Sequence, residues 1–353
     1  MPRHLAYCAA LLGVFVIDNP QCGAYRATHT QLAQVYLRDG LYDQALAETR
    51  RALREEDGDT QLLLIVTLAY MGQDQPEPAL DFLRQAINLE PDNPELYAIL
   101  REICLHYDRF DQISESLARL NADHPQSAWP LAMQGWIHGQ QDRFDEAAVA
   151  LRQAIALDDS HLFARGELSR ILIAGKHYAE AEAMLNQTLR IQPGAQRLLL
   201  ALGDCQLHQG HLTRADSTFR KALATGTGTE AVVDIARIYY EHQHPDRAIE
   251  YYERALARAP DDAMILNNLA WTYALEGLRL DYALELSMQA VKLEAQSPVY
   301  LDTYAELLHQ LGRHAQAAAI MGRALASEPV DGEHRAYLEG QMEKFRQALA
   351  PRL

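Results

Sequence analysis

The chain has 353 residues, of which 48% are hydrophobic and 23% charged, a balance that supports a large buried core and excludes a disordered protein. Its 48 acidic and 32 basic residues give a net charge of −16 with histidine neutral, and the sequence contains no run of lysine or arginine. Nucleic acid is therefore not an expected partner, because proteins that bind it present positive charge to the phosphates.

Residues 5–17 form the long apolar run of the chain and are its first predicted element. A run of 13 residues is too short for a membrane span but suits the core of a signal peptide. No small-x-small cleavage site follows it, and Cys22 before Gly23 only partly resembles a lipidation site. Residues 1–25 are predicted to be an export signal or membrane anchor, and the protein would then lie in the periplasm or at the envelope. The alternative is that they form a capping helix of a cytoplasmic protein.

Alanine then recurs with a period of 34 residues along nearly the whole chain. The recurring residues are Ala45, Ala79, Ala147, Ala181, Ala215, Ala248, Ala283 and Ala317. A fixed period of this length is typical of helical hairpins stacked in a row. With these alanines at position 20, the predicted repeats are 26–59, 60–93, 94–127, 128–161, 162–195, 196–228, 229–262, 263–297 and 298–331.

Positions 8 and 27 of the repeats also carry mainly small residues, so helix axes can approach closely at these points. A bulkier side chain there is expected to cost about 1–3 kcal/mol by overpacking. Gly40, Gly210 and Gly312 fall between the two helices of a hairpin, where glycine commonly ends a helix. The third repeat departs from the pattern: Arg101, Ile113 and Leu120 occupy its three small positions, and its helices are expected to lie farther apart or to be shifted.

This arrangement of small residues, together with tyrosine at position 11 of four repeats, closely resembles the tetratricopeptide-repeat family over residues 26–331. The resemblance implies an all-α fold in which about nine antiparallel helix pairs wind into a right-handed solenoid. It also implies a concave groove lined by the first helix of each repeat. Residues 332–353 contain an amphipathic stretch and are predicted to form a C-terminal capping helix and tail.

The resemblance also implies which residues face the groove. All three tryptophans of the chain fall at such positions, and large aromatic residues and arginine dominate binding hot spots. The predicted partner-binding residues are Trp129, Met133, Trp136, Phe163, Arg170, Arg237, Asn267, Asn268 and Trp271. The alternative is that these side chains only pack between neighbouring first helices.

The sequence shows none of the motifs that mark nucleotide phosphate loops, dinucleotide folds, serine nucleophiles or zinc proteases. His242 and His244 lie next to Pro245, but side chains two residues apart on a helix point in different directions, so a metal site is not expected. No catalytic residue, metal or cofactor is predicted.

The sequence therefore predicts a non-catalytic scaffold or adaptor that binds an extended or helical segment of a protein partner in the groove. An exported protein of this kind would resemble repeat proteins that help to assemble bacterial envelope machines. The alternative is an accessory subunit of a polysaccharide- or glycan-handling enzyme complex, because aromatic side chains can also stack on sugars. The sequence favours no particular oligomeric state.

Overall fold

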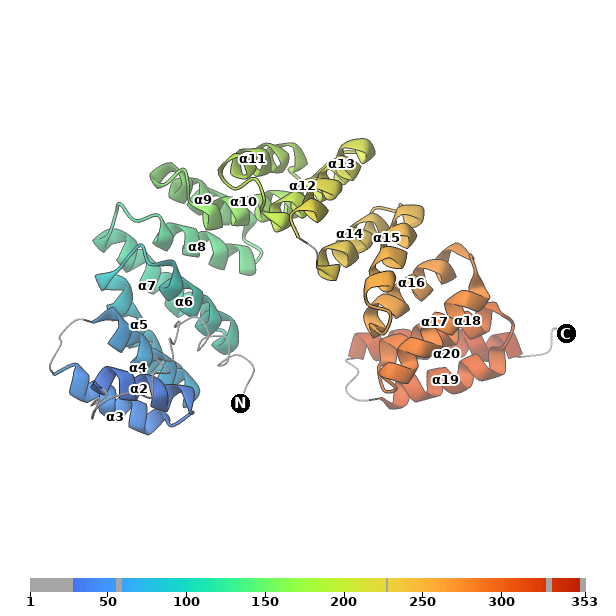
Figure 1. Cartoon of the computed structure of the whole chain (residues 1–353), viewed down its shortest axis with the longest axis horizontal. Coiled ribbons are helices and arrows are strands. Elements are labelled where there is room, and N and C mark those ends of the chain that lie inside the picture. Colours follow the sequence, from blue (N-terminus) through green and yellow to red (C-terminus); the bar gives the residue numbers. More distant parts are fainter. Residues whose placement is uncertain (1–27, 55–58, 227, 328–331, 350–353) are drawn as a thin grey trace, which may run out of the picture. The chain divides into compact units, whose positions relative to one another are not determined.

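The computed structural model describes residues 28–54, 59–226, 228–327 and 332–349, and within these ranges the chain is α-helical without β-strands. The predicted N-terminal segment 1–25 lies outside the described residues. The chain divides into two compact units, residues 1–184 and 185–353, with the boundary inside helix α11. Each unit is a row of helical hairpins in sequence order, as Figure 1 shows for the helices labelled below. None of the described helices is both long and apolar enough to cross a membrane.

The hairpins of the first unit use helices that run from α2 to the boundary helix α11. Their bounds are α2 His29–Arg38, α3 Tyr42–Ala52, α4 Thr60–Gly72, α5 Pro76–Leu89, α6 Pro94–Tyr107, α7 Phe110–Asp123, α8 Trp129–Gln140, α9 Phe144–Leu157, α10 Leu162–Ala174 and α11 Tyr178–Ile191. Polar side chains start several of them: Asp59 and Asn93 accept hydrogen bonds from the first-turn amides of α4 and α6.

The second unit continues the same alternation of helices and ends in a longer one. Their bounds are α12 Gln196–His208, α13 Leu212–Ala224, α14 Thr229–Glu241, α15 Pro245–Arg258, α16 Ala263–Glu276, α17 Leu280–Leu293, α18 Pro298–Gln310, α19 His314–Ala326 and α20 Gly332–Leu349. The last of these helices, α20, packs against α19.

The small residues of the repeat lie where two helices meet. All eight recurring alanines at position 20 have 0% exposure. At position 8 the contact is equally tight: a Cβ added to Gly203 would lie 2.2 Å from a ring carbon of Phe219 on the facing helix. Paired helices held this closely by small residues are the arrangement that the 34-residue period predicts, and the all-α repeat fold is confirmed.

The turn between the two helices of a hairpin has the same backbone conformation throughout both units. The fifteenth residue of every repeat has a positive φ, between 53° and 75°. Glycine, which adopts this conformation without strain, occupies the position in Gly40, Gly210, Gly277 and Gly312. The other repeats place Asp74, Asp108, Asp142, Lys176 and Gln243 there. The repeat geometry thus imposes the turn even where the side chain disfavours it.

The third repeat differs from its neighbours as its sequence predicts. The pairs α2/α3, α4/α5 and α8/α9 of the first unit have close backbone contact, and neither α6/α7 nor α10/α11 is among the closely contacting pairs. Ile113 and Leu120 are buried, with 1% and 4% exposure. Arg101 occupies the remaining small position but is not fully buried.

Helix α20 covers the end of the second unit. Its own residues Leu338 and Phe345 are fully buried. At its edge the hydroxyl of Tyr337 donates to Oδ2 of Asp302 on α18 over 3.2 Å. The pKa of Asp302 is raised to about 6, mainly by burial and in smaller part by the neighbouring Glu306, against the opposing effect of the Tyr337 hydrogen bond.

The raised pKa of Asp302 predicts that the protein loses stability as the pH rises. The pKa of an aspartate in an unfolded chain is about 3.9, so the native state binds the extra proton between about pH 4 and pH 6. Its folded-state pKa is raised, so the stability of the unit falls as the pH rises through this window. Asp302→Asn is expected to be about 1–3 kcal/mol more stable than the native chain at pH 7 and nearly equal to it at pH 4. Urea unfolding at both values tests this, and an equal difference at both would contradict it.

Candidate functional site

Three aromatic rings stack along neighbouring repeats of the first unit. The ring of Trp129, the first residue of α8, lies 5.1 Å from that of Tyr97 and 5.6 Å from that of Phe163, with interplanar angles of 13° and 23°. Tyr97 is fully buried, while Trp129 and Phe163 are partly exposed. The stack therefore presents two of the predicted groove residues, one from α8 and one from α10, to the surface.

A buried histidine supports this stack from beneath. The ring of His161 lies 4.4 Å from that of Trp129, and its Nδ1 accepts a hydrogen bond from the amide of Ala164. Burial lowers the pKa of His161, which favours the neutral ring. Its Nε2 is buried without a hydrogen-bond partner among the described residues, which is unfavourable for a ring nitrogen. The buried ring of His161 therefore packs against one side of Trp129.

Trp136 and Met133 do not belong to the exposed surface, and the prediction that they contact a partner is wrong on this point. Trp136 has 2% exposure and Met133 has 0%. Both side chains pack in the hydrophobic core of the first unit, where the ring of Phe110 lies 6.3 Å from that of Trp136. Their groove-facing positions are covered because the first helices of successive repeats lie close together. The packing alternative holds for these two residues.

Arg101 is the residue of this face that the groove positions of the family did not indicate. Its guanidinium carbon lies 5.1 Å from the ring centre of Trp136 and 5.3 Å from that of Phe163. Its Nε is buried without a hydrogen-bond partner, and the ion pairs of the described residues do not include it. Two aromatic faces hold the cation in place by cation–π attraction. The sequence signal for Arg101 was that a charged residue occupies position 8, which holds small residues in the other repeats.

Arg170 lies on the same face of the first unit and is exposed. Its Nε donates to Oε2 of Glu167 over 2.9 Å. One of its terminal nitrogens lies over Gly139, 2.8 Å from where a Cβ would stand. Arg101, Trp129, Phe163 and Arg170 together form what we call the aromatic–arginine face, which spans repeats three to five.

The predicted residues of the second unit are held by neighbours within that unit. Exposed Arg237 pairs with Glu241 at 2.7 Å and with Asp234 at 3.6 Å. Burial lowers the pKa of Arg237, but these two carboxylates raise it on balance. Trp271 is partly exposed and donates from Nε1 to the hydroxyl of Tyr240 over 3.1 Å.

The two neighbouring asparagines have different environments. Asn267 has 4% exposure, and its Oδ1 is buried without a hydrogen-bond partner. The prediction that Asn267 contacts a partner is therefore wrong, because its position is covered by the packed first helices. Asn268 is partly exposed, and its backbone oxygen accepts from the hydroxyl of Thr272 over 2.7 Å. Of the two asparagines, only Asn268 remains accessible beside Trp271.

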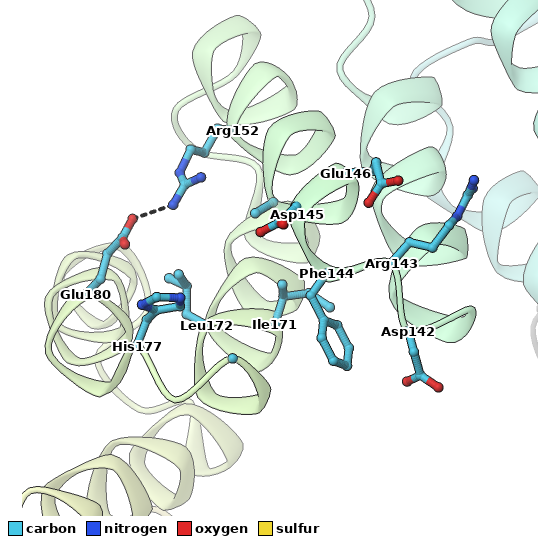
Figure 2. A pocket seen from close by; sticks show the side chains of 12 residues that line it. Asp142, Arg143, Phe144, Asp145, Glu146, Arg152, Ile171, Leu172, His177 and Glu180 are labelled. Atoms are coloured by element: carbon cyan, nitrogen blue, oxygen red, sulfur yellow. Dashed lines mark hydrogen bonds and ion pairs between the residues drawn. The ribbon is translucent and has the colours of Figure 1, made fainter.

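The first unit also contains a hollow of about 480 Å³ between the fourth and fifth repeats. Figure 2 shows the ion pair of Arg152 and Glu180, 2.6 Å long, which joins α9 to α11 across it. Charged and apolar side chains of both hairpins line the hollow. A smaller hollow of about 360 Å³ lies between the second and third repeats. Such hollows therefore accompany the stacking of hairpins, and this one shows no arrangement specific to a reaction.

Comparisons with known proteins agree with this architecture. Sequence profiles described as tetratricopeptide repeats match residues 26–51, 140–197, 176–233, 233–286 and 298–323, which together exceed half of the chain. The chain is 21% identical over 249 residues to the BBSome complex member BBS4 homolog of Drosophila melanogaster, covering 68% of this chain and 51% of that protein. It is 26% identical over 156 residues to the human protein O-mannosyl-transferase TMTC1, covering 43% of this chain and 18% of that protein.

A solved tetratricopeptide repeat protein from Parabacteroides merdae aligns with 81% of this chain and 98% of its own, with a TM-score of 0.49 and 14% identity. The chain spans about half or less of the two curated relatives named above. The matched repeat profiles and the helical hairpins of both units lead to one assignment: the chain belongs to the tetratricopeptide-repeat family.

Proposed function

We propose that this chain is a non-catalytic interaction scaffold whose aromatic–arginine face binds a segment of a protein partner. Stacked repeats present an extended surface, which suits binding of a chain segment better than enclosure of a small substrate. The name of the Drosophila relative describes a member of a protein complex, in agreement with such a role. The observation that carries the proposal is Arg101, a cation held between two rings without an acidic partner among the described residues.

The face combines anchoring with orientation. Partly exposed Trp129 and Phe163 offer apolar surface whose burial favours binding, and their stack with Tyr97 fixes both rings before a partner arrives. An arginine whose own protein supplies no acceptor can donate to a carboxylate or backbone carbonyl of the partner. Arg170, already paired with Glu167, is a weaker candidate because binding would compete with that pair. We therefore propose a segment with an apolar side chain next to an acidic one.

Peptide selection tests this proposal while the partner itself is still unidentified. A random-peptide display library selected on the full chain is expected to yield sequences that combine an aromatic or aliphatic residue with Asp or Glu. Trp129→Ala is expected to weaken their binding by about 2 kcal/mol or more, as for hot-spot residues. Arg101→Met, which keeps the length of the side chain without its charge, is expected to weaken peptides that carry the acidic residue and to spare those in which it is changed to alanine.

The control is Trp271→Ala, which removes a partly exposed tryptophan from the other unit. This variant is expected to bind the selected peptides like the native chain. The alternative function is that of a glycan-handling accessory subunit. It is tested by titrating the protein with oligosaccharides and following its tryptophan fluorescence. Quenching by sugars together with a failure to select any peptide sensitive to Trp129→Ala would overturn the proposal.

The location in a bacterial envelope stays a proposal that rests on residues 5–17, outside the described part of the chain. Fractionation of cells that express the full chain, with the mature N-terminus sequenced, distinguishes the export signal from a retained segment.

A further inference from the structure

Two histidines and an aspartate converge in the second unit. Nε2 of His242 lies 2.7 Å from Oδ1 of Asp204, and Nε2 of His208 lies 3.8 Å from the same oxygen. The two imidazole rings meet edge to face, with centroids 4.2 Å apart. One ligand atom from each of the three residues lies within 4.8 Å of the others. The cluster shares no residue with the aromatic–arginine face.

The repeat geometry brings these residues together. Asp204 and His208 are four residues apart on α12, so their side chains lie on one face of that helix. His242 caps the C-terminus of α14, the first helix of the next repeat, and α12 and α14 are in contact. Both helices end at the cluster, and the partial negative charge of a helix C-terminus favours a cation.

The donor set and its accessibility suit a transition metal. Imidazole nitrogens and a carboxylate oxygen are common ligands of Zn²⁺ and related divalent ions. With metal–ligand bonds of about 2.0–2.2 Å, the ligand atoms of a tetrahedral site lie roughly 3.4 Å apart. The distances of 2.7 and 3.8 Å fall on either side of this value, so small side-chain rotations suffice. His208 is exposed, which leaves a path for the ion and for a water ligand.

We propose that Asp204, His208 and His242 bind one divalent transition-metal ion, with Zn²⁺ as the best match, and that the ion joins the ends of α12 and α14. The metal takes the place of the hydrogen between His242 Nε2 and Asp204, and the neutral imidazole then carries its one ring proton on Nδ1. Three protein ligands leave a fourth position for water. In chain order α13 lies between α12 and α14, so the ion would clamp two first helices that the chain otherwise connects only through the second helix of the hairpin.

Metal titration of the full chain tests the proposal. The protein is stripped with EDTA and dialysed, then titrated with ZnCl₂ in a calorimeter and with CoCl₂ in a spectrophotometer. One ion per chain is expected at this site, with visible Co²⁺ bands typical of a four-coordinate site with nitrogen and oxygen ligands. His208→Gln, His242→Gln and Asp204→Asn are each expected to weaken Zn²⁺ binding at this site by at least roughly 100-fold, since even groups that only orient ligands contribute about 10–100-fold.

His244→Gln is the matched control, because His244 is two residues from His242 but its ring lies beside that of Tyr239. This variant is expected to bind Zn²⁺ like the native chain. The ligand variants also lose the hydrogen bond that joins His242 to Asp204 without metal, so thermal unfolding is measured both in EDTA and in Zn²⁺. Only the native chain and His244→Gln should melt at a higher temperature in Zn²⁺ than in EDTA. No Zn²⁺ binding by the native chain, or equal binding by the native chain and all three ligand variants, would overturn the proposal.

Discussion

Trp136→Ala is expected to lower the free energy of unfolding of the first unit by about 3–5 kcal/mol, the usual range for truncating a buried aromatic residue. The side chain has 2% exposure, and its removal leaves a cavity and takes away one of the two rings over which Arg101 is held. Hydrogen exchange of the α8 amides, with urea unfolding followed by circular dichroism, gives the local and the overall effect.

Trp271→Ala provides the comparison, since it truncates the same residue type at a partly exposed position. Its effect on stability is expected to be clearly smaller. Trp136→Phe, which keeps a ring, should recover part of the loss. If Trp136→Ala and Trp271→Ala destabilise the chain equally, Trp136 is not the core residue that its burial indicates.

Ala147→Leu is expected to lower the free energy of unfolding by about 1–3 kcal/mol, because the larger side chain overpacks a helix contact. Ala147 is fully buried on α9, and its backbone oxygen lies 3.1 Å from where a Cβ on Gly135 would stand. The larger leucine side chain therefore has no space unless α8 and α9 move apart. Thermal and urea unfolding measure the loss.

The same substitution at Ala156, which is exposed on the same helix, controls for the helix propensity and hydrophobicity of leucine. Ala156→Leu is expected to change the free energy of unfolding by about 0.5 kcal/mol or less, as for ordinary surface positions. Equal losses from both variants would mean that the repeat register of this helix is wrong.

Much of the fold follows from the sequence because one constraint recurs in every repeat. The recurring alanines mark where helices touch, and Thr60, Pro94 and Gln196 each begin both a predicted repeat and an observed helix. The third repeat departs from this pattern, and its Ile113 and Leu120 are buried while Arg101 stays partly exposed.

Which groove positions are open could not be predicted in the same way. Trp136 and Arg170 occupy the same position of consecutive repeats, yet one is buried and the other exposed. Trp136 is covered by Phe110 and Arg101, two side chains of the preceding repeat, and the period of the repeat does not indicate such cover. Arg101 shows the reverse case, because its place at a small position marked it as unusual without indicating that two rings would hold it.

The cluster of Asp204, His208 and His242 could not be recognised from neighbours in the chain. His242 and His244 are close in sequence, yet they do not share a site. In a stack with a 34-residue period, the neighbours in space are instead about one repeat away, and Asp204 lies 38 residues before His242. Histidine and aspartate residues separated by about one repeat are therefore the sequence signal for such a cluster.

The shared left-handed turn has a consequence for how such a chain can change in length. Each hairpin reverses direction at its fifteenth residue with nearly the same backbone angle, whether glycine, aspartate, lysine or glutamine stands there. Any two of these turns are therefore structurally equivalent places at which repeats could be joined. Genetic recombination between two such turns would duplicate or delete one whole repeat and would keep every following repeat in register. The array could therefore become longer or shorter while every hairpin keeps the same turn.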